Sequence, residues 1–236
     1  MKRTAALLIL ITLIFATTLT AKGREDEVAR LSEASTVLNE IMSAPDKGIP
    51  MEILHDARCV AVVPSLLKGG FIVGAAYGKG VASCRTDKGW SAPAFFKIEG
   101  GSLGLQIGGQ AVDYVMVFMD DYGMKTLLSS KFKLGVDASA AAGPVGRHVE
   151  GMTDWKMKNQ ILTYSRARGV FAGVTLNGAA IHQDDDAVRE FYGHRSTFRT
   201  ILNGLIECPK DGTIFQQTVS KHVSASDIET RKPAKK

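Results

Sequence analysis

A succession of short apolar segments, rich in small residues, fills the chain from Ala57 to Gly193. Glycine makes up 24 of the 236 residues, and glycine inside strand patterns marks bulges, tight bends or close backbone approach. Strands and helices do not alternate regularly, which argues against a parallel doubly wound sheet. We therefore predict an α+β fold: a bent, mostly antiparallel, glycine-rich sheet, partly closed like a barrel, with helices at both ends.

Two turns are predicted within this sheet. The segments 71–77 and 80–86 are expected to form a hairpin across Gly78-Lys79, and Asn177-Gly178 is a strong two-residue hairpin signal. Further strands are expected at Cys59–Val63, Trp90–Ile98, Val112–Met119, Thr163–Ser165, Val170–Leu176 and Ala179–His182.

Helical patterns flank and interrupt these strands. Residues Glu25–Ala44 carry apolar side chains at helical spacing. A membrane-inserting helix and a helix packed on the domain are both compatible with this pattern, and the acidic polar face favours packing, because membrane-surface helices prefer basic polar faces. Further helices are predicted at Pro50–Asp56, Tyr122–Ser130, Asp184–Tyr192 and Ser196–Glu207.

The N-terminus is typical of a secretory signal peptide. Lys2 and Arg3 precede an apolar stretch, Ala5–Phe15, which is shorter than the roughly 20 residues of a membrane span. Cleavage is predicted after Ala21, which places the mature protein in the periplasm or outside the cell. The expected organisation is a signal peptide at 1–21, a helical lead-in at 22–56, the main domain at 57–208 and an extension with a basic tail at 209–236.

Positive charge is concentrated at the two ends of the chain. The net charge of +5 falls to −1 without Lys2, Arg3 and the four basic residues of the final RKPAKK. A nucleic-acid-binding domain carries its basic stripe on the folded part, so the sequence argues against nucleic acid as a partner.

The chain has three cysteines, Cys59, Cys84 and Cys208. In an oxidising compartment two of them can pair. Cys59 and Cys84 lie on neighbouring predicted strands and are the preferred disulfide, which leaves Cys208 as the odd thiol; the sequence leaves other pairings open.

Two motifs partly match the patterns of a catalytic site and a metal site, but the surrounding sequence fits neither. Gly100-Gly101-Ser102-Leu103-Gly104 matches the G-x-S-x-G pattern of serine hydrolases, but glycines follow where a helix should begin. His182–Asp186 offers possible metal ligands, but their spacing does not match a calcium loop. A glycine-rich turn and a solvated helix start explain the two motifs, so we expect no catalytic residues and no metal.

Basic side chains within the strand-rich region are candidate ligands for phosphate headgroups, because arginine forks suit phosphate. The candidates are Lys79, Arg147, Arg166 and Arg168. Ordinary strand-edge charge is the competing interpretation.

Several ordered blocks of the sequence together resemble the SYLF domain family, a lipid-binding module also described as an actin regulator. They are VVPSLLKGGFIVG (62–74), GWSAPAFF (89–96), GLQIGGQAVDYVMVF (104–118), KFKLGVDASAAAGPVGR (131–147), YSRARGVFAGVTLNG (164–178) and FYG (191–193). The resemblance covers most of the chain after the signal peptide and is closest to a secreted, bacterial-type member.

The resemblance implies a non-enzymatic domain that needs no cofactor and that binds membranes, in eukaryotic members through phosphoinositides. Here the helix that is basic in those members is acidic, and no SH3 or FYVE segment is evident. The expected partner is an anionic phospholipid or another envelope amphiphile. A structural or protein-interaction role in the envelope, with a protein partner, is the alternative function, and a serine hydrolase using Ser102 is the third.

Overall fold

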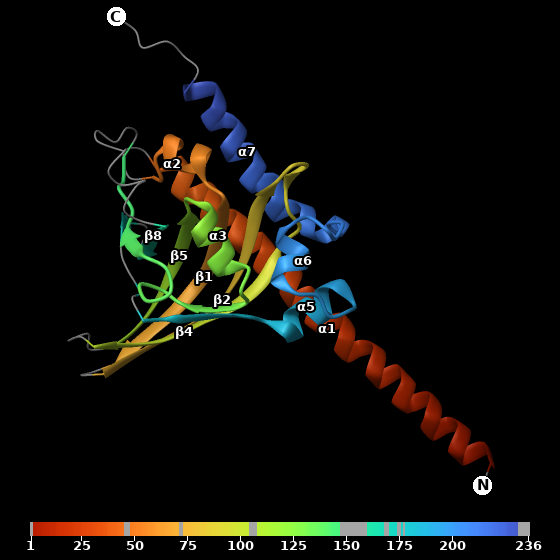
Figure 1. Ribbon diagram of the computed structural model, residues 1–236. Coiled ribbons are helices and arrows are strands. Elements are labelled where there is room, and N and C mark those ends of the chain that lie inside the picture. Colours follow the sequence, from red (N-terminus) through yellow and green to blue (C-terminus); the bar gives the residue numbers. More distant parts are fainter. Residues whose placement is uncertain are drawn as a thin grey trace, which may run out of the picture.

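The computed structural model describes residues 2–44, 48–70, 73–103, 108–146, 160–167, 170–173, 176 and 178–230 (Figure 1). The helices are α1 (Lys2–Ser43), α2 (Met51–Asp56), α3 (Asp121–Leu127), α5 (Asp185–Tyr192), α6 (Phe198–Leu202), the 3-10 turn η1 (Lys210–Gly212) and α7 (Thr213–Thr230). The strands are β1 (Cys59–Gly70), β2 (Val73–Thr86), β3 (Gly89–Trp90), β4 (Ala94–Leu103), β5 (Gly108–Phe118), β6 (Lys131–Lys133), β7 (Ala140–Ala142), β8 (Ile161–Ala167), β9 (Val170–Gly173) and β10 (Ala180–Gln183).

These strands form one ten-stranded sheet. Its order is β6-β10-β4-β2-β1-β5-β8-β7, with β3 paired to β2 and β9 paired to β8. The pairs are antiparallel except β7 with β8. The predicted α+β fold with a bent, mostly antiparallel sheet and helices at both ends is confirmed.

The sheet curls far enough for strands distant in its order to touch. Phe118 on β5 and Phe132 on β6 pack edge to face with their ring centroids 6.3 Å apart, although β5 is sixth in the order and β6 is first. The concave side therefore encloses its own core, as a partly closed barrel does.

Helix α1 covers the other face of the sheet, and α7 lies beside it (Figure 1). The buried side chains Leu31, Leu38 and Ile41 are fully excluded from solvent and recur at the helical spacing expected for a packed face. Packing on the domain, the favoured alternative for residues 25–44, is what the structure has. Among the described residues, no helix is both long and apolar enough to cross a membrane.

Coverage of both faces explains the apolar run at the start of β1. All residues from Cys59 to Val63 have zero exposure, because α1 lies over one face and the curled sheet encloses the other. Strands buried on both sides lose the alternation of polar and apolar residues. Hydrophobic pattern therefore located this strand without indicating its orientation.

The hairpin predicted across Gly78-Lys79 is wrong. Strand β2 runs without a turn from Val73 to Thr86. A Cβ atom at Gly78 would lie 2.6 Å from Val63 Cγ1 and 2.8 Å from Leu66 Cδ1. Glycine is needed at this position for close packing against β1 and not for a turn.

The hairpin predicted at Asn177-Gly178 is also wrong, because β9 pairs with β8 while β10 pairs with β4 and β6. Gly178 has a positive φ of 86°, and its N–H donates to Leu134 O at 2.7 Å, so the glycine turns the chain between two different pairings. The helix expected at 196–207 is limited to α6, and the strand expected at 90–98 is divided between β3 and β4.

The preferred disulfide is present. Cys59 and Cys84 are directly opposite on β1 and β2, and their sulfur atoms are bonded. Cys208 is a free thiol, and burial raises its pKa to about 11.

Candidate functional site

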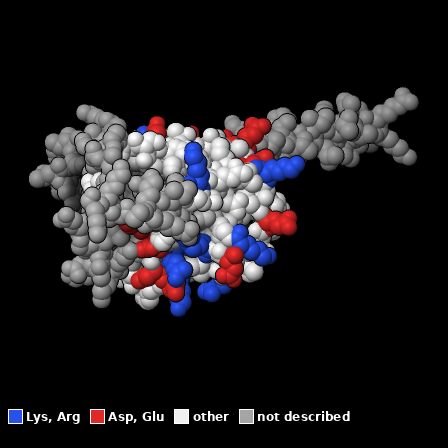
Figure 2. All heavy atoms as spheres, turned by 90° about the horizontal axis from the view of Figure 1, so that it is seen from above, with Lys and Arg blue, Asp and Glu red and all other residues white. Residues whose placement is uncertain are grey.

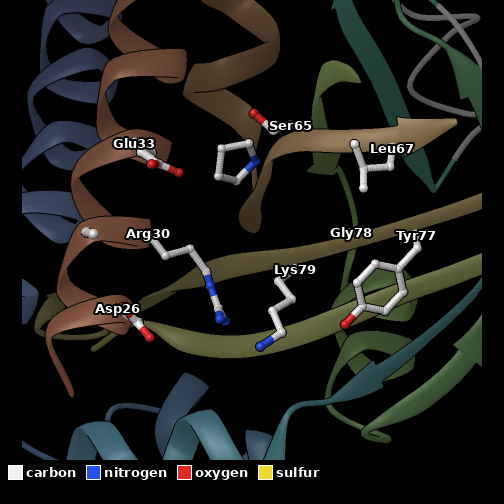
Figure 3. Close-up of a pocket in the computed structure, with 10 residues that line it drawn as sticks. Asp26, Arg30, Glu33, Ser65, Leu67, Tyr77, Gly78 and Lys79 are labelled. Carbon is white, nitrogen blue, oxygen red and sulfur yellow. The ribbon is translucent and has the colours of Figure 1, made fainter. Parts of the chain in front are cut away.

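A pocket of about 360 Å³ opens between α1 and the strands β1 and β2 (Figure 3). Its volume falls within the range of small-molecule sites. The helix contributes one charged wall and the strands contribute a mixed polar and apolar wall. The lining residues are Asp26, Ala29, Arg30, Glu33, Pro64, Ser65, Leu67, Tyr77, Gly78 and Lys79.

A bulge in β1 shapes the strand side of this pocket. The register of β1 shifts against β5 between Val63 and Leu66, and Ser65 within the bulge has a positive φ of 55°. The Ser65 N–H donates to Asp113 Oδ1 at 3.1 Å, which holds the bulged backbone in place. Bulges often re-aim side chains beside functional sites.

Two cations point into the pocket from opposite walls. Figure 3 shows the Arg30 guanidinium, from α1, and the Lys79 ammonium, from β2, directed into the same space. The side chain of Lys79 is 45% exposed, whereas that of Arg30 is 9% exposed. Arg30 is therefore buried at the base of the pocket, and Lys79 is the cation that a ligand can reach.

The buried carboxylate of Asp184 lies close to both of these cations. Asp184 precedes α5 and caps it, accepting from the Ala187 N–H at 3.3 Å. Its oxygens also lie 3.0 Å from Lys97 Nζ, 3.8 Å from Arg30 Nη1 and 4.0 Å from Lys79 Nζ. The hydrogen bond to Asp184 raises the pKa of Lys97. Asp184 thus faces three basic residues.

The second acidic residue of this cluster, Glu27, is only partly ionised near neutral pH. Glu27 is 2% exposed, and this burial raises its pKa to about 7 against the opposing effect of Arg30. With Glu27 protonated, Arg30, Lys79 and Lys97 share the buried carboxylate of Asp184, while Asp26 and Glu33 of α1 also line the pocket. The partly exposed Lys79 is the cation that an anion in the pocket would meet.

An exposed apolar pair lies next to the cations. Leu67 on β1 and Tyr77 on β2 are directly opposite in the register, so they share one face of the sheet. They are 57% and 42% exposed, and both line the pocket. Charge and apolar surface therefore adjoin at the place where β1 and β2 pass beyond α1.

The charge distribution over the rest of the described surface is mixed. In the view of Figure 2, basic and acidic side chains intermingle, and a broad uncharged area adjoins them. A basic stripe of the kind that nucleic acid requires is not seen on this face.

Arg166, another predicted headgroup ligand, lies apart from Lys79. Its Nε donates to Asp113 Oδ2 at 2.7 Å, and its Nη1 pairs with Glu40 of α1. Glu40 is ten residues after Arg30, or about 15 Å along the helix axis. The structure therefore does not bring Arg166 and Lys79 into one cluster, and Arg147 and Arg168 lie outside the described residues.

The backbone at Ser102 does not have the geometry of a nucleophile elbow. Ser102 lies within β4, paired with Gly74 of β2, whereas the elbow requires a sharp turn from a strand into a helix. The next described element is the strand β5.

The residues His182–Asp186 also have structural partners. His182 Nε2 lies 3.4 Å from Glu99 Oε2, Asp184 caps α5, and Asp186 pairs with Arg189. In the described part of the chain, no three His, Cys, Asp or Glu side chains are grouped to hold a metal ion.

Sequence reasoning identified Lys79 but missed its neighbours. Arg30 lies within the predicted helix Glu25–Ala44 and Asp184 begins the predicted helix Asp184–Tyr192, and neither position indicates a place beside Lys79. Leu67 and Tyr77 were hidden within apolar strand patterns, since only the register shows that they are opposite each other and uncovered. Leu67 and Tyr77 are both exposed because α1 does not cover the sheet at their positions. A local sequence pattern does not indicate where that coverage ends.

Comparison with known proteins identifies the family of this chain. Residues 99–222, more than half of the chain, match the family model described as "Ysc84: Las17-binding protein actin regulator". The chain belongs to the Ysc84, or SYLF, family. This family is linked to actin regulation and lipid binding, and its domains are generally non-catalytic binding modules.

Relatives in yeast and animals are similar over most of the chain. LAS seventeen-binding protein 3 of Saccharomyces cerevisiae is 31% identical over 192 residues, covering 80% of this chain and 41% of that protein. SH3 domain-containing YSC84-like protein 1 is 29% identical over 209 residues in Bos taurus, covering 87% of this chain and 61% of the relative. The human protein of the same name is 32% identical over 172 residues, covering 71% and 50%. The chain thus spans about half the length of these relatives.

Proposed function

We propose that this Ysc84-family protein is a non-enzymatic phospholipid-binding protein of the cell envelope. The observation that carries the proposal is the pocket between α1 and β2, where Lys79 and Arg30 adjoin the exposed pair Leu67 and Tyr77. A phospholipid has the complementary arrangement, because its anionic phosphate adjoins its apolar acyl chains.

In this mechanism the phosphate oxygen atoms approach the Lys79 ammonium, and the Arg30 guanidinium strengthens the positive field from below. Leu67 and Tyr77 enter the boundary between headgroups and acyl chains, where the amphipathic ring of tyrosine is favoured. Arg166, held by Asp113 and Glu40, acts on the structure of the sheet and contributes little to headgroup contact.

The proposed location in the envelope rests on two features. The first is the basic and then apolar N-terminus, proposed as a signal peptide at 1–21. The second is the Cys59–Cys84 disulfide, since disulfides persist in oxidising compartments. Mass spectrometry of the protein recovered from a producing cell should give a chain that begins at Lys22; a chain that retains residues 1–21 would contradict the cleavage.

Co-sedimentation with vesicles tests the lipid function. The purified protein should bind phosphatidylglycerol vesicles more tightly than phosphatidylcholine vesicles, and added salt should weaken the binding. Lys79→Ala should weaken binding about fivefold, since one lysine near an anionic surface contributes ~1 kcal/mol. The double variant Leu67→Ser, Tyr77→Ser should weaken binding at least about tenfold through lost apolar burial. Lys210→Ala, an exposed change outside the pocket, is the matched control.

A protein partner is the second candidate function, because an exposed apolar pair suits a protein contact as well. The family description and the name of the yeast relative, a LAS seventeen-binding protein, support it. Absence of vesicle binding under all salt conditions would reject the lipid proposal in favour of this one. Binding that none of the pocket variants weakens would show that the pocket is not the lipid site.

A further inference from the structure

Four basic residues form a row across the sheet. Lys79 on β2 is directly opposite Lys97 on β4, Lys97 is opposite His182 on β10, and His182 is opposite Lys131 on β6. Directly paired residues of neighbouring strands project from the same face. At about 4.8 Å per strand the row is roughly 14 Å long, and the lipid pocket lies at its Lys79 end.

Like charges directly opposite one another destabilise a sheet unless they are compensated. At one end of the row, Asp184 compensates Lys97 and Lys79. At the other end, Glu99 Oε2 lies 3.4 Å from His182, and Lys131 has no acidic partner within salt-bridge distance among the described residues. The uncompensated charge is thus concentrated at the β6 edge.

A second pocket, of about 470 Å³, lies at this edge. Lys131 and His182 line it from the sheet, and Arg195 lines it from the loop that follows α5. Arg195 is exposed and, like Lys131, has no ion pair in the described part of the chain. Hydroxyl groups of Ser130 and Ser196 also belong to the lining, and Asp185 is its acidic member.

The amide of Gln183 fixes the loop that carries Arg195. Gln183 Nε2 donates to Ser196 O at 2.6 Å and to Asp185 Oδ1 at 2.8 Å. Its Oε1 accepts from the Phe198 N–H at 2.8 Å. The loop is therefore bonded to the end of β10, and its backbone is fixed beside the pocket that Lys131, His182 and Arg195 line. A loop that is ordered before binding lowers the entropic cost of binding.

We propose that this second pocket binds a phosphate group, separately from the lipid pocket. The guanidinium of Arg195 can bind two phosphate oxygens at once, and Lys131 adds a point charge. His182 and the serine hydroxyls supply further donors, and together the basic groups outweigh Asp185. The phosphate is either a lipid headgroup or a free phosphate, since both present the same oxygens.

The test is a titration of the full chain with inorganic phosphate, followed by NMR of the histidine ring resonances, with His182→Asn used to assign the His182 signal. Phosphate should shift the His182 signal in a saturable manner, and sodium chloride at matched ionic strength should not. Arg195→Ala and Lys131→Ala should each weaken binding about tenfold, as expected for loss of one charge-assisted contact. Lys210→Ala should bind as the unchanged protein does.

Phosphatidylglycerol vesicles separate the two sources of phosphate. If the source is a headgroup, Arg195→Ala also weakens co-sedimentation; if it is free phosphate, this variant loses phosphate binding while its vesicle binding is retained. A His182 signal that does not respond to phosphate, or that responds equally to chloride, would overturn the proposal. Unchanged phosphate affinity in both variants would overturn it as well. The Leu67 and Tyr77 variants report on the lipid pocket independently.

Discussion

Glu27 and Arg30 form an ion pair one turn apart on α1, with Glu27 Oε2 2.9 Å from Arg30 Nη1. Their side chains are only 3% and 9% exposed, so the pair lies within the contact between the helix and the rest of the domain. Burial of both partners makes the interaction sensitive to protonation, because a buried carboxylate loses its hydration.

Glu27→Gln should change how the stability of the protein depends on pH. In the folded protein the pKa of Glu27 is raised from 4.5 to about 7, so between these values the native state binds more protons than the unfolded state. The free energy of unfolding contributed by this group therefore falls as pH rises through that window. The difference in unfolding free energy between variant and unchanged protein should shift by about 2.5 kcal/mol in favour of the variant between about pH 5 and pH 8.

Urea unfolding at the two pH values measures this shift. Glu33→Gln on the same helix, at an exposed position, is the control and should leave the pH dependence unchanged. A constant difference between Glu27→Gln and the unchanged protein across the window would show that Glu27 is ionised throughout.

Reduction of the Cys59–Cys84 disulfide should destabilise the protein by about 3 kcal/mol, because the bridge closes a loop in the unfolded chain. The two residues are 25 positions apart. Urea unfolding of Cys59→Ala, Cys84→Ala should give the same loss as dithiothreitol. Cys208→Ser removes the free thiol instead and should unfold close to the unchanged protein. Equal stability with and without reductant would mean that the bridge constrains little.

Gly80→Ala should destabilise the sheet by about 1–3 kcal/mol through overpacking. A Cβ atom at Gly80 would lie 2.4 Å from Phe96 Cζ and 2.7 Å from Val62 O, and the backbone oxygen of a central strand cannot easily move away. Ala75→Ser at an exposed position of the same strand is the control and should change stability by less than about 0.5 kcal/mol. Thermal unfolding of the two variants distinguishes them; a Gly80→Ala protein with unchanged stability would show that Phe96 has room to rotate.

Local sequence patterns predict many of the strands and helices of this fold. They fail where the structure depends on packing between residues that are far apart in the sequence. Apolar runs predicted β1 and β5, and Asp184 marked the start of α5, because strands and helix caps depend on neighbouring residues. Gly78 was interpreted as a turn because the sequence does not show that Val63 and Leu66 lie against it.

The residues of the candidate site are even harder to predict from local sequence than the fold is. Lys79 was identified by residue type, but its significance depends on Arg30 and Asp184, which are 154 positions apart in the sequence. The basic row across β2, β4, β10 and β6 can likewise be recognised only from the strand register, because β4 and β10 are far apart in the sequence.

Asp184→Asn should cost about 3 kcal/mol of stability, the usual loss when one partner of a buried ion pair is removed. Asparagine is as good a helix cap as aspartate, so the loss reports charge and not capping. Lys97 and Lys79 would then lose the carboxylate they face, and Arg30 would keep only Glu27 as a partner. Asp186→Asn, whose side chain is 67% exposed and pairs with Arg189, is the matched control and should change stability by less than about 0.5 kcal/mol. Urea unfolding measures both, and an Asp184→Asn protein as stable as the control would show that Asp184 acts only as a cap.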